Sequence, residues 1–296
     1  MRSFIQIVAV LCLIFSASTS YAQAEKNDSS GSIEWQTLVI PRINPLGLFA
    51  ANSLSYRIPL YDSESPLLKT NFLRFAFQPW ISPSWFRPGA RLDVQPLSIL
   101  KLSLLHEFIF HFGSFGILQS FNSPDADYSD DRLQIGRDNN ENYTPLGQQT
   151  TVAALLQAKV GPIAIRNNFK LIHTNYDLRQ GDSAFYDQFL DLLLPGEGWS
   201  FADDIDLLFL TDFGLIAGLR YTITQAYYDQ GEQPATHRLG PLITFKFLDH
   251  PNAALSEVSG ILLANWWLKH PYRTGQETSQ FIPYLGVGVK LAGTLY

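Results

Sequence analysis

The chain is poor in cysteine and in charge, and beyond its first residues it has no long hydrophobic run. Its only cysteine, Cys12, lies in the N-terminal apolar stretch, so no disulfide is expected to stabilise the remainder. Charged residues make up 16% of the sequence, whereas about 25% is usual in soluble domains. A membrane-spanning helix needs about 20 consecutive apolar residues, which the rest of the chain does not provide. These absences exclude a disulfide-stapled secreted domain and a bundle of membrane-spanning helices.

The first residues have the pattern of a secretory signal peptide. Arg2 provides a short basic start, residues 4–15 form a short apolar core, and small residues precede the predicted cleavage site. The pattern predicts a cleaved signal peptide over residues 1–22, with cleavage after Ala24 as the alternative. Residues 23–32, which read QAEKNDSSGS, are expected to form a flexible polar tail in the periplasm.

What the chain has instead is alternation of apolar and polar residues. In residues 91–112, for example, Leu102 and Leu104 fall in one register and Ser103 falls in the other. A period of two indicates β-strands, because successive side chains point to opposite faces. Twelve such segments can be placed: 33–41, 47–60, 69–81, 85–96, 100–113, 149–160, 162–174, 199–210, 214–228, 237–249, 258–270 and 279–296. Alternation alone does not decide whether the apolar face points inward or into lipid.

The connections between these segments indicate a membrane barrel. If the last strand ends in the periplasm, every periplasmic connection is eight residues or fewer. The two long connections, 114–148 and 175–198, then both fall on the outer side. Short periplasmic turns, long extracellular loops and an even number of strands are typical of outer-membrane barrels. We therefore predict an all-β, single-chain transmembrane antiparallel β-barrel of about 12 strands over residues 33–296.

Aromatic residues gather at the predicted outer strand ends. Amphipathic rings favour the headgroup layer of a membrane, so these residues are expected to form an interfacial girdle. The expected girdle residues are Trp80, Trp85, Phe86, Trp199, Phe201, Tyr227, Tyr228, Trp266, Trp267 and Tyr272.

Residues 33–296 thus resemble the bacterial outer-membrane β-barrel, porin-like class, at the level of architecture and without indicating a specific family. The resemblance implies an integral protein of a Gram-negative outer membrane, in contact with outer-membrane lipid and lipopolysaccharide. It also implies assembly by periplasmic chaperones and the barrel assembly machinery; the oligomeric state is left open. One feature departs from the class. The terminal aromatic Tyr296 is one residue out of phase with the apolar register, which indicates a bulge near Gly293 or a shifted last strand.

The polar register of the strands predicts a basic lumen, with thirteen basic residues against four acidic ones. The residues predicted to line it are Arg57, Arg74, Arg91, Lys101, Glu107, Arg166, Lys170, Asp204, Asp206, Arg220, Arg238 and Lys246. A basic lumen favours anions, so we predict a narrow porin-like channel for small polar or anionic solutes. The alternative is a plugged barrel acting through its extracellular loops, in which each arginine pairs with a carboxylate or carbonyl and a long loop fills the mouth.

A second alternative is an outer-membrane lipid-modifying enzyme. Four histidines fall at outer strand ends, where such an enzyme would place its catalytic groups: His111, His173, His237 and His270. A nucleophile also needs a positioned base and an orienting group, and no motif of that kind is recognisable. The sequence therefore predicts a protein that is not an enzyme.

The longest loop contains spaced carboxylates that could contact a hard cation: Asp125, Asp127, Asp130 and Asp131. Their spacing lacks the glycine and the terminal glutamate of an EF-hand loop, so a solvated acidic loop is the expectation. No metal and no cofactor are predicted. A formal net charge of −6 argues against binding to nucleic acid.

Overall fold

The structure, a computed structural model, describes residues 31–116, 118–144, 146–231, 233–251, 253–275 and 281–295. The predicted signal peptide, nearly all of the predicted tail and Tyr296 lie outside these residues. Within the described residues the strands are β1 (Ser32–Ile43), β2 (Gly47–Ile58), β3 (Phe72–Ile81), β4 (Trp85–Leu97), β5 (Leu100–His111), β6 (Ser120–Phe121), β7 (Leu146–Val160), β8 (Ile163–Tyr176), β9 (Ala184–Asp187), β10 (Leu192–Pro195), β11 (Glu197–Leu210), β12 (Leu215–Ala226), β13 (Ala235–Asp249), β14 (Glu257–Lys269) and β15 (Tyr284–Thr294). The helices are η1 (Ser114–Gly116) and α2 (Asp130–Asp138). In this part of the chain no helix is long and apolar enough to cross a membrane.

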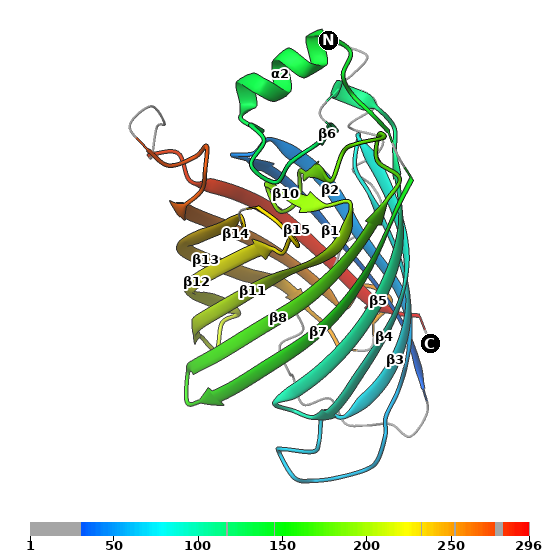
Figure 1. Ribbon diagram of the computed structural model, residues 1–296. Coiled ribbons are helices and arrows are strands. Elements are labelled where there is room, and N and C mark those ends of the chain that lie inside the picture. The colour runs from blue at the N-terminus through cyan, green and yellow to red at the C-terminus, as the bar shows by residue number, and fades with distance from the viewer. Residues whose placement is uncertain are drawn as a thin grey trace, which may run out of the picture.

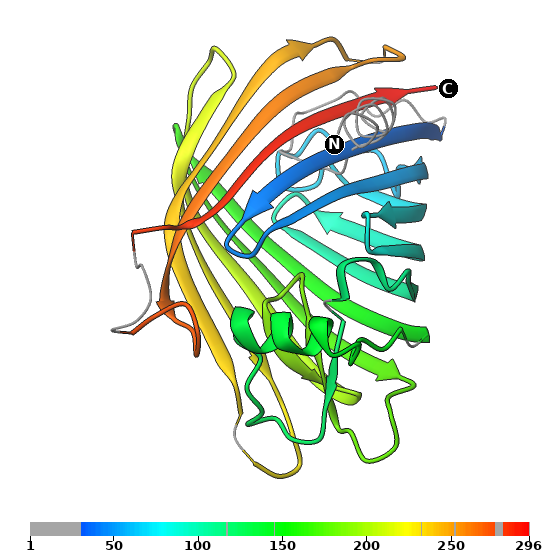
Figure 2. The same cartoon turned by 90° about the horizontal axis from the view of Figure 1, so that it is seen from above.

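Among the described residues, twelve strands form one closed antiparallel barrel (Figures 1 and 2). Each strand pairs with its neighbour along the chain, and β1 closes the ring by pairing with β15. Both long connections lie at the same end, where α2, β6 and β10 appear in Figure 1, and the C-terminus lies toward the other end. The predicted twelve-stranded barrel with long loops on one side is therefore confirmed; we call the loop-bearing end the outer end.

The barrel is apolar outside and polar inside. Leu102, Leu104 and Phe108 on β5 are each nearly half exposed, whereas Ser103 and Glu107 in the other register are buried. A closed barrel has no sheet edge to cover, so this exposed apolar band requires a hydrocarbon environment. The alternation therefore places the apolar register against lipid and the polar register in the lumen.

One periplasmic connection is longer than predicted. It runs over residues 59–71, between Ile58 of β2 and Phe72 of β3. Its backbone is folded around Asn71, whose Oδ1 accepts the N–H groups of Leu60 (2.7 Å) and Tyr61 (2.9 Å). The polar side chain organises a compact turn, so the strands end earlier than their alternation suggests.

The predicted aromatic girdle is only half correct. The residues that face outward are Phe86, Trp199, Phe201, Tyr227 and Trp266. The residues that pack inside are Trp80, Trp85, Tyr228, Trp267 and Tyr272. The reason is the alternation itself, because two consecutive residues of a strand, such as Trp266 and Trp267, must point to opposite faces.

The last strand keeps a single register against β1. The register of β15 against β1 is continuous from Leu285 opposite Ile43 to Thr294 opposite Glu34. The bulge predicted near Gly293 is therefore absent from this pairing. Gly293 serves a close approach instead, because a Cβ atom there would lie 1.9 Å from the carbonyl oxygen of Ala254.

Polar side chains on the lipid face form hydrogen bonds with one another. His106, which falls in the lipid register, lies 2.9 Å from the Thr150 hydroxyl through its Nδ1 and packs edge-on against Phe108. Further from the outer end, Asn167 Nδ2 donates to Asp203 Oδ1 at 2.6 Å. Polar groups in hydrocarbon are costly unless they are paired, which accounts for these contacts.

We expect replacement of the whole lipid-facing pair, Asp203→Leu with Asn167→Leu, to raise the free energy of unfolding by about 1–2 kcal/mol, because it removes a polar pair from hydrocarbon. Asn167→Leu alone should lower it, since the carboxylate then loses its donor. Urea unfolding of the barrel in lipid vesicles measures both effects. A double variant less stable than the wild type would contradict the expectation.

Candidate functional site

The outer mouth of the barrel contains a folded plug. We call residues 177–196, which connect β8 to β11, the plug segment. Its strands β9 and β10 pair with each other, and β9 also pairs with β6 of the preceding loop; within the described residues these three strands form a separate sheet. Phe185 and residues 192–194 are between 0 and 1% exposed. Sequence reasoning treated this segment as an open loop, because two four-residue strands carry too little alternation to be recognised.

The plug segment shares a hydrophobic core with the helical loop and the barrel wall. Phe185 and Leu193 pack with Leu133 of α2, with Ile109 of β5 and with Tyr176 of β8. The helix begins at an N-cap, Ser129, whose hydroxyl accepts the N–H group of Arg132 at 3.2 Å. The acidic stretch predicted to be a solvated loop is therefore partly helical, and α2 lies at the outer end of the barrel (Figure 1).

A buried ion pair locks the turn of the plug segment. Asp191, between β9 and β10, is 1% exposed and accepts hydrogen bonds from Arg273 of the β14–β15 loop and from the hydroxyl of Tyr186 (2.7 Å). His270 Nε2 lies 3.3 Å from the same carboxylate. Burial alone would raise the pKa of Asp191, but the hydrogen bonds from His270 and Arg273 outweigh burial and hold that pKa well below its usual range. We call the Asp191–Arg273 pair the latch.

A second anchor joins the plug segment to β1. The guanidinium of Arg42 donates to the backbone carbonyls of Gln188 and Phe189 (3.1 Å for the latter). The Phe189 ring packs edge-on against Phe49 at 5.3 Å between centroids and lies 5.8 Å from Trp80. Wall residues therefore hold the plug from two sides, and Trp80 contributes to this contact rather than to the girdle.

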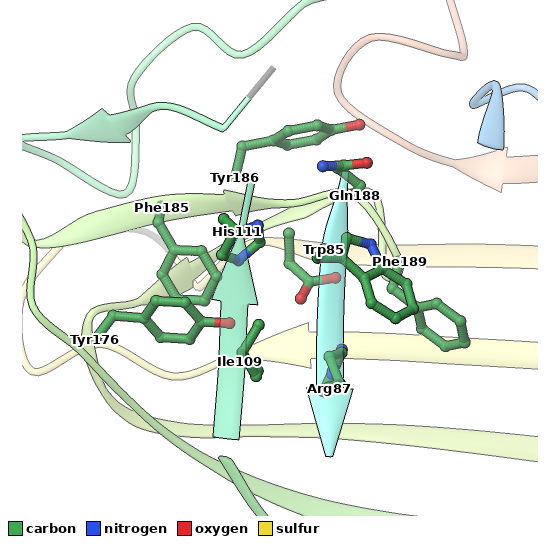
Figure 3. A pocket seen from close by; sticks show the side chains of 10 residues that line it. Trp85, Arg87, Ile109, His111, Tyr176, Phe185, Tyr186, Gln188 and Phe189 are labelled. Atoms are coloured by element: carbon green, nitrogen blue, oxygen red, sulfur yellow. The ribbon is translucent and has the colours of Figure 1, made fainter. Parts of the chain in front are cut away.

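Between plug and wall there is a cavity of about 10 Å³, room for about one water molecule (Figure 3). Arg87, His111 and Tyr176 from the wall line it together with Asp187 and Gln188 from the plug segment. Both ring nitrogens of His111 are buried without a hydrogen-bond partner among the described residues. The cavity is polar but too small for a solute, so it offers no passage here.

Below the plug, one group of ion pairs spans β1 to β4. Arg74 of β3 binds the fully buried Asp93 of β4 through Nε (2.9 Å), and Arg91 binds the other oxygen of the same carboxylate (2.7 Å). Arg57 and Arg74 also lie 3.5 Å and 3.9 Å from the carboxylate of Glu34 on β1.

A second group of ion pairs spans β8 to β12. Asp206 of β11, which is fully buried, accepts from Arg166 Nε (2.8 Å) on one side and from Arg220 Nε (2.7 Å) on the other. Asp204, two residues earlier, pairs with Lys170 at 3.0 Å. Each carboxylate is thus bridged to the strands on either side of it.

All twelve residues predicted to line the lumen lie in the lumen register of the strands. Glu107 pairs with Arg87 at 3.1 Å and Lys246 with Asp249 at 3.0 Å. Sequence reasoning missed three lumen carboxylates because they lie near strand ends: Glu34, Asp249 and Glu257. Lys101 and Arg238 make no ion pair with any carboxylate among the described residues.

The predicted acidic cation site is not assembled. Asp130 is bound to Arg273 at 3.0 Å, and Asp127 accepts the backbone N–H of Ser129 at 2.8 Å. Asp125 contacts Ser123, and Asp131 lies in the first turn of α2. In the part of the chain that the structure describes, no three His, Cys, Asp or Glu side chains are grouped so that they could hold a metal ion.

The histidines at the outer strand ends do not share one site. His111 faces the cavity under the plug, and His270 is buried beside Asp191. His173 lies on the lipid face, 4.7 Å from the Trp199 ring, and His237 Nδ1 lies 2.7 Å from the Tyr221 hydroxyl. The alternation of the strands divides these four side chains between two faces of the wall.

No family of known proteins matches the sequence, and no curated relative is similar to it. Among solved structures, the chain is similar to the COG4313 outer membrane channel from Pseudomonas putida F1, with a TM-score of 0.40, 11% identity, and 94% of this chain and 100% of that chain covered. It is also similar to the translocator domain of the autotransporter NalP from Neisseria meningitidis (TM-score 0.33, 10% identity, 91% and 89% covered). A third similar structure is the loop L8 deletion mutant of OmpT, an outer membrane protein of Vibrio cholerae (TM-score 0.35, 10% identity, 90% and 100% covered).

Such identities and TM-scores carry no argument about function. The strand pairing and the exposed apolar band of this chain establish its architecture directly. The protein is an integral outer-membrane β-barrel whose polar lumen is paired along the wall and whose outer mouth holds a latched plug.

Proposed function

We propose that the barrel is a narrow, gated channel that favours small anionic or polar solutes, with the plug segment as its gate. Positive charge remains in the lumen because Lys101 and Arg238 make no ion pair among the described residues. A cationic lumen in a low-dielectric wall attracts anions and repels cations. Release of the latch would expose this lumen to the outside.

The main support for the proposal is that the lumen ion pairs join neighbouring strands of the wall. Arg166 and Arg220 are the direct cross-strand partners of Asp206, on the strands flanking β11. Arg74 and Asp93 are likewise direct cross-strand partners on neighbouring strands. Pairs of this kind lie along the wall, whereas a plugged lumen requires pairs that cross it. These pairs support the proposal because they hold the polar lining against the wall.

A second candidate function is a closed barrel that acts through its outer loops. The fully buried residues 192–194 and the latch favour it, because they make the plug a packed structure rather than a loose loop. In that case the plug would stay in place and the lumen charges would only stabilise the wall.

Recording in planar lipid bilayers tests the proposal. We expect the wild-type protein to be closed most of the time, with small anion-selective steps. Arg273→Ala should raise the open time strongly, because the latch is lost. In that background, Lys101→Glu with Arg238→Glu should reverse the selectivity toward cations, because the lumen charge changes sign.

Arg137→Glu is the control, because it reverses one positive charge on the exposed face of α2, outside the lumen. It should leave the selectivity unchanged. Bilayers that stay silent with Arg273→Ala would rule out the channel and leave the closed barrel. Cation-selective steps in that variant would rule out the preference for anions.

A further inference from the structure

A cluster of cationic and aromatic side chains lies on the lumen wall beside the plug. The guanidinium of Arg238 on β13 lies 4.2 Å from the ring centroid of Tyr284 on β15 and 5.4 Å from that of Trp267 on β14. The guanidinium of Arg42 on β1 lies 5.9 Å from the same Tyr284 ring. Two arginines from different strands therefore converge on one tyrosine ring.

Two hydrogen-bond donors of this cluster, one on Arg238 and one on Trp267, are buried without a partner among the described residues. Within the described residues Arg238 makes no ion pair and no side-chain hydrogen bond. The two donors are its Nε and the Nε1 of Trp267. Stacking on aromatic rings occupies the flat faces of a guanidinium and leaves its N–H groups free along the edge, in the fork geometry that matches a carboxylate.

The charges around Arg238 also favour an anion. Arg42 and Arg220 are near enough to repel it electrostatically. Asp204 attracts it, but the oxygens of that carboxylate already accept from Lys170 at 3.0 Å and from the Thr222 hydroxyl at 2.7 Å. An anion that binds here gains from uncompensated positive charge.

The same cluster is connected to the plug. Arg42 donates to the carbonyls of Gln188 and Phe189, and its guanidinium lies 5.5 Å from the Phe189 ring. A carboxylate accepts hydrogen bonds more strongly than a backbone carbonyl does. An anion beside Tyr284 would therefore compete with the plug for Arg42.

We propose that Arg238, Trp267, Tyr284 and Arg42 form a binding site for a flat organic anion, an aromatic carboxylate, whose binding loosens the plug. The aromatic rings supply apolar faces for the ligand, and the guanidinium edges bind its carboxylate. Only the loosening of the plug rests on the proposed channel function, since the binding site stands on the cluster alone.

Benzoate is the probe, added to the purified folded barrel in detergent and followed by isothermal titration calorimetry. We expect saturable binding that is weaker by about tenfold or more in Arg238→Gln, which loses one charge-assisted hydrogen bond. Trp267→Phe, which keeps an aromatic ring and loses the N–H donor, should also weaken binding. Lys246→Gln, a lumen variant outside the cluster, should bind as the wild type does, and neutral benzyl alcohol should not bind.

Absence of saturable benzoate binding, equal binding to wild type and Arg238→Gln, or equal binding of benzyl alcohol would each overturn the site. Faster tryptic cleavage after Arg179 of the plug segment in benzoate would support loosening, and an unchanged rate would overturn that part. The calorimetric readout needs no conduction. Benzoate binding to a protein that stays silent in bilayers would therefore refute the channel and leave the site, whereas conduction without benzoate binding would refute the site alone.

Discussion

Arg273→Ala should open the outer mouth of the barrel while leaving the strands intact. Arg273 is 8% exposed and binds the buried carboxylate of Asp191 through two nitrogens. Its loss leaves that carboxylate with only Tyr186 and His270 in an apolar surrounding. Breaking a buried pair in this way costs about 3–5 kcal/mol, which shifts a local opening equilibrium by about two orders of magnitude or more.

Trypsin reports this opening, because Arg179 lies in the plug segment and donates to the carbonyls of Glu141 and Asn142 in the closed form. Cleavage after Arg179 should be much faster in Arg273→Ala, while the heat-modifiable mobility of the folded barrel on gels stays the same. Arg132→Ala is the control, because it breaks the partly exposed Arg132–Glu141 pair of the same outer loops. Equal cleavage rates in Arg273→Ala and wild type would show that the latch does not hold the plug.

We also expect the latch to open in acid, but only at a pH below about 4. The pKa of Asp191 is held below its ordinary value of about 3.9 by the hydrogen bonds from His270 and Arg273. A carboxyl with a lowered pKa stabilises the closed form fully above its ordinary pKa, and that stabilisation is lost as the pH falls below it. A fast-acting acid protease such as pepsin should therefore find the plug closed at pH 5 and increasingly open below about pH 4. A plug that is already open at pH 5–6 would contradict this expectation.

Asp206→Ala should cause the largest loss of barrel stability among the lumen variants. Arg166 and Arg220 face each other across this single, fully buried carboxylate. Its removal leaves two adjacent cations without their shared partner, and a broken buried pair costs about 3–5 kcal/mol. Urea unfolding in detergent micelles should show a clearly lower midpoint for Asp206→Ala than for Asp206→Asn, which keeps an oxygen acceptor.

A triple variant tests whether the loss of stability in Asp206→Ala comes from unpaired charge or from lost side-chain packing. The triple variant Asp206→Ala with Arg166→Met and Arg220→Leu removes all three charges, and replacing buried charges by apolar groups is often neutral or stabilising. We expect it to regain most of the lost stability. Asp249→Ala is the control, because its pair with Lys246 is partly exposed at the periplasmic end of the barrel. A triple variant as unstable as Asp206→Ala would contradict the electrostatic explanation.

The barrel can be predicted from the sequence because a membrane imposes a simple alternation of apolar and polar residues on its strands. A strand with lipid on one side and water on the other must alternate strictly, so twelve periodic segments and two long connections were sufficient. Residues at strand ends escape this rule. Glu34 and Glu257 lie near the first residues of β1 and β14, and leaving them out exaggerated the excess of positive charge in the lumen.

The plug was not predictable in the same way. Its strands β9 and β10 are four residues long, and residues 192–194 are apolar throughout and show no period at all. The helix was within reach, since Ser129 followed by Asp130 and Asp131 is an N-cap with an acidic first turn. The partners of the plug could not be predicted, because Asp191 and Arg273 are 82 positions apart in the sequence. Only the closed ring brings them together.

That distance along the chain has a consequence for assembly. Arg273 also binds Asn44, which follows β1, and the two residues are 229 positions apart. The contact with Asn44 spans the junction at which β15 pairs with β1, so it forms only once the ring is complete. Contacts so remote in sequence form late, because long segments of chain must be ordered before they are made. We therefore expect Arg273 to reach all its partners late in assembly, so that a sealed mouth reports a closed barrel.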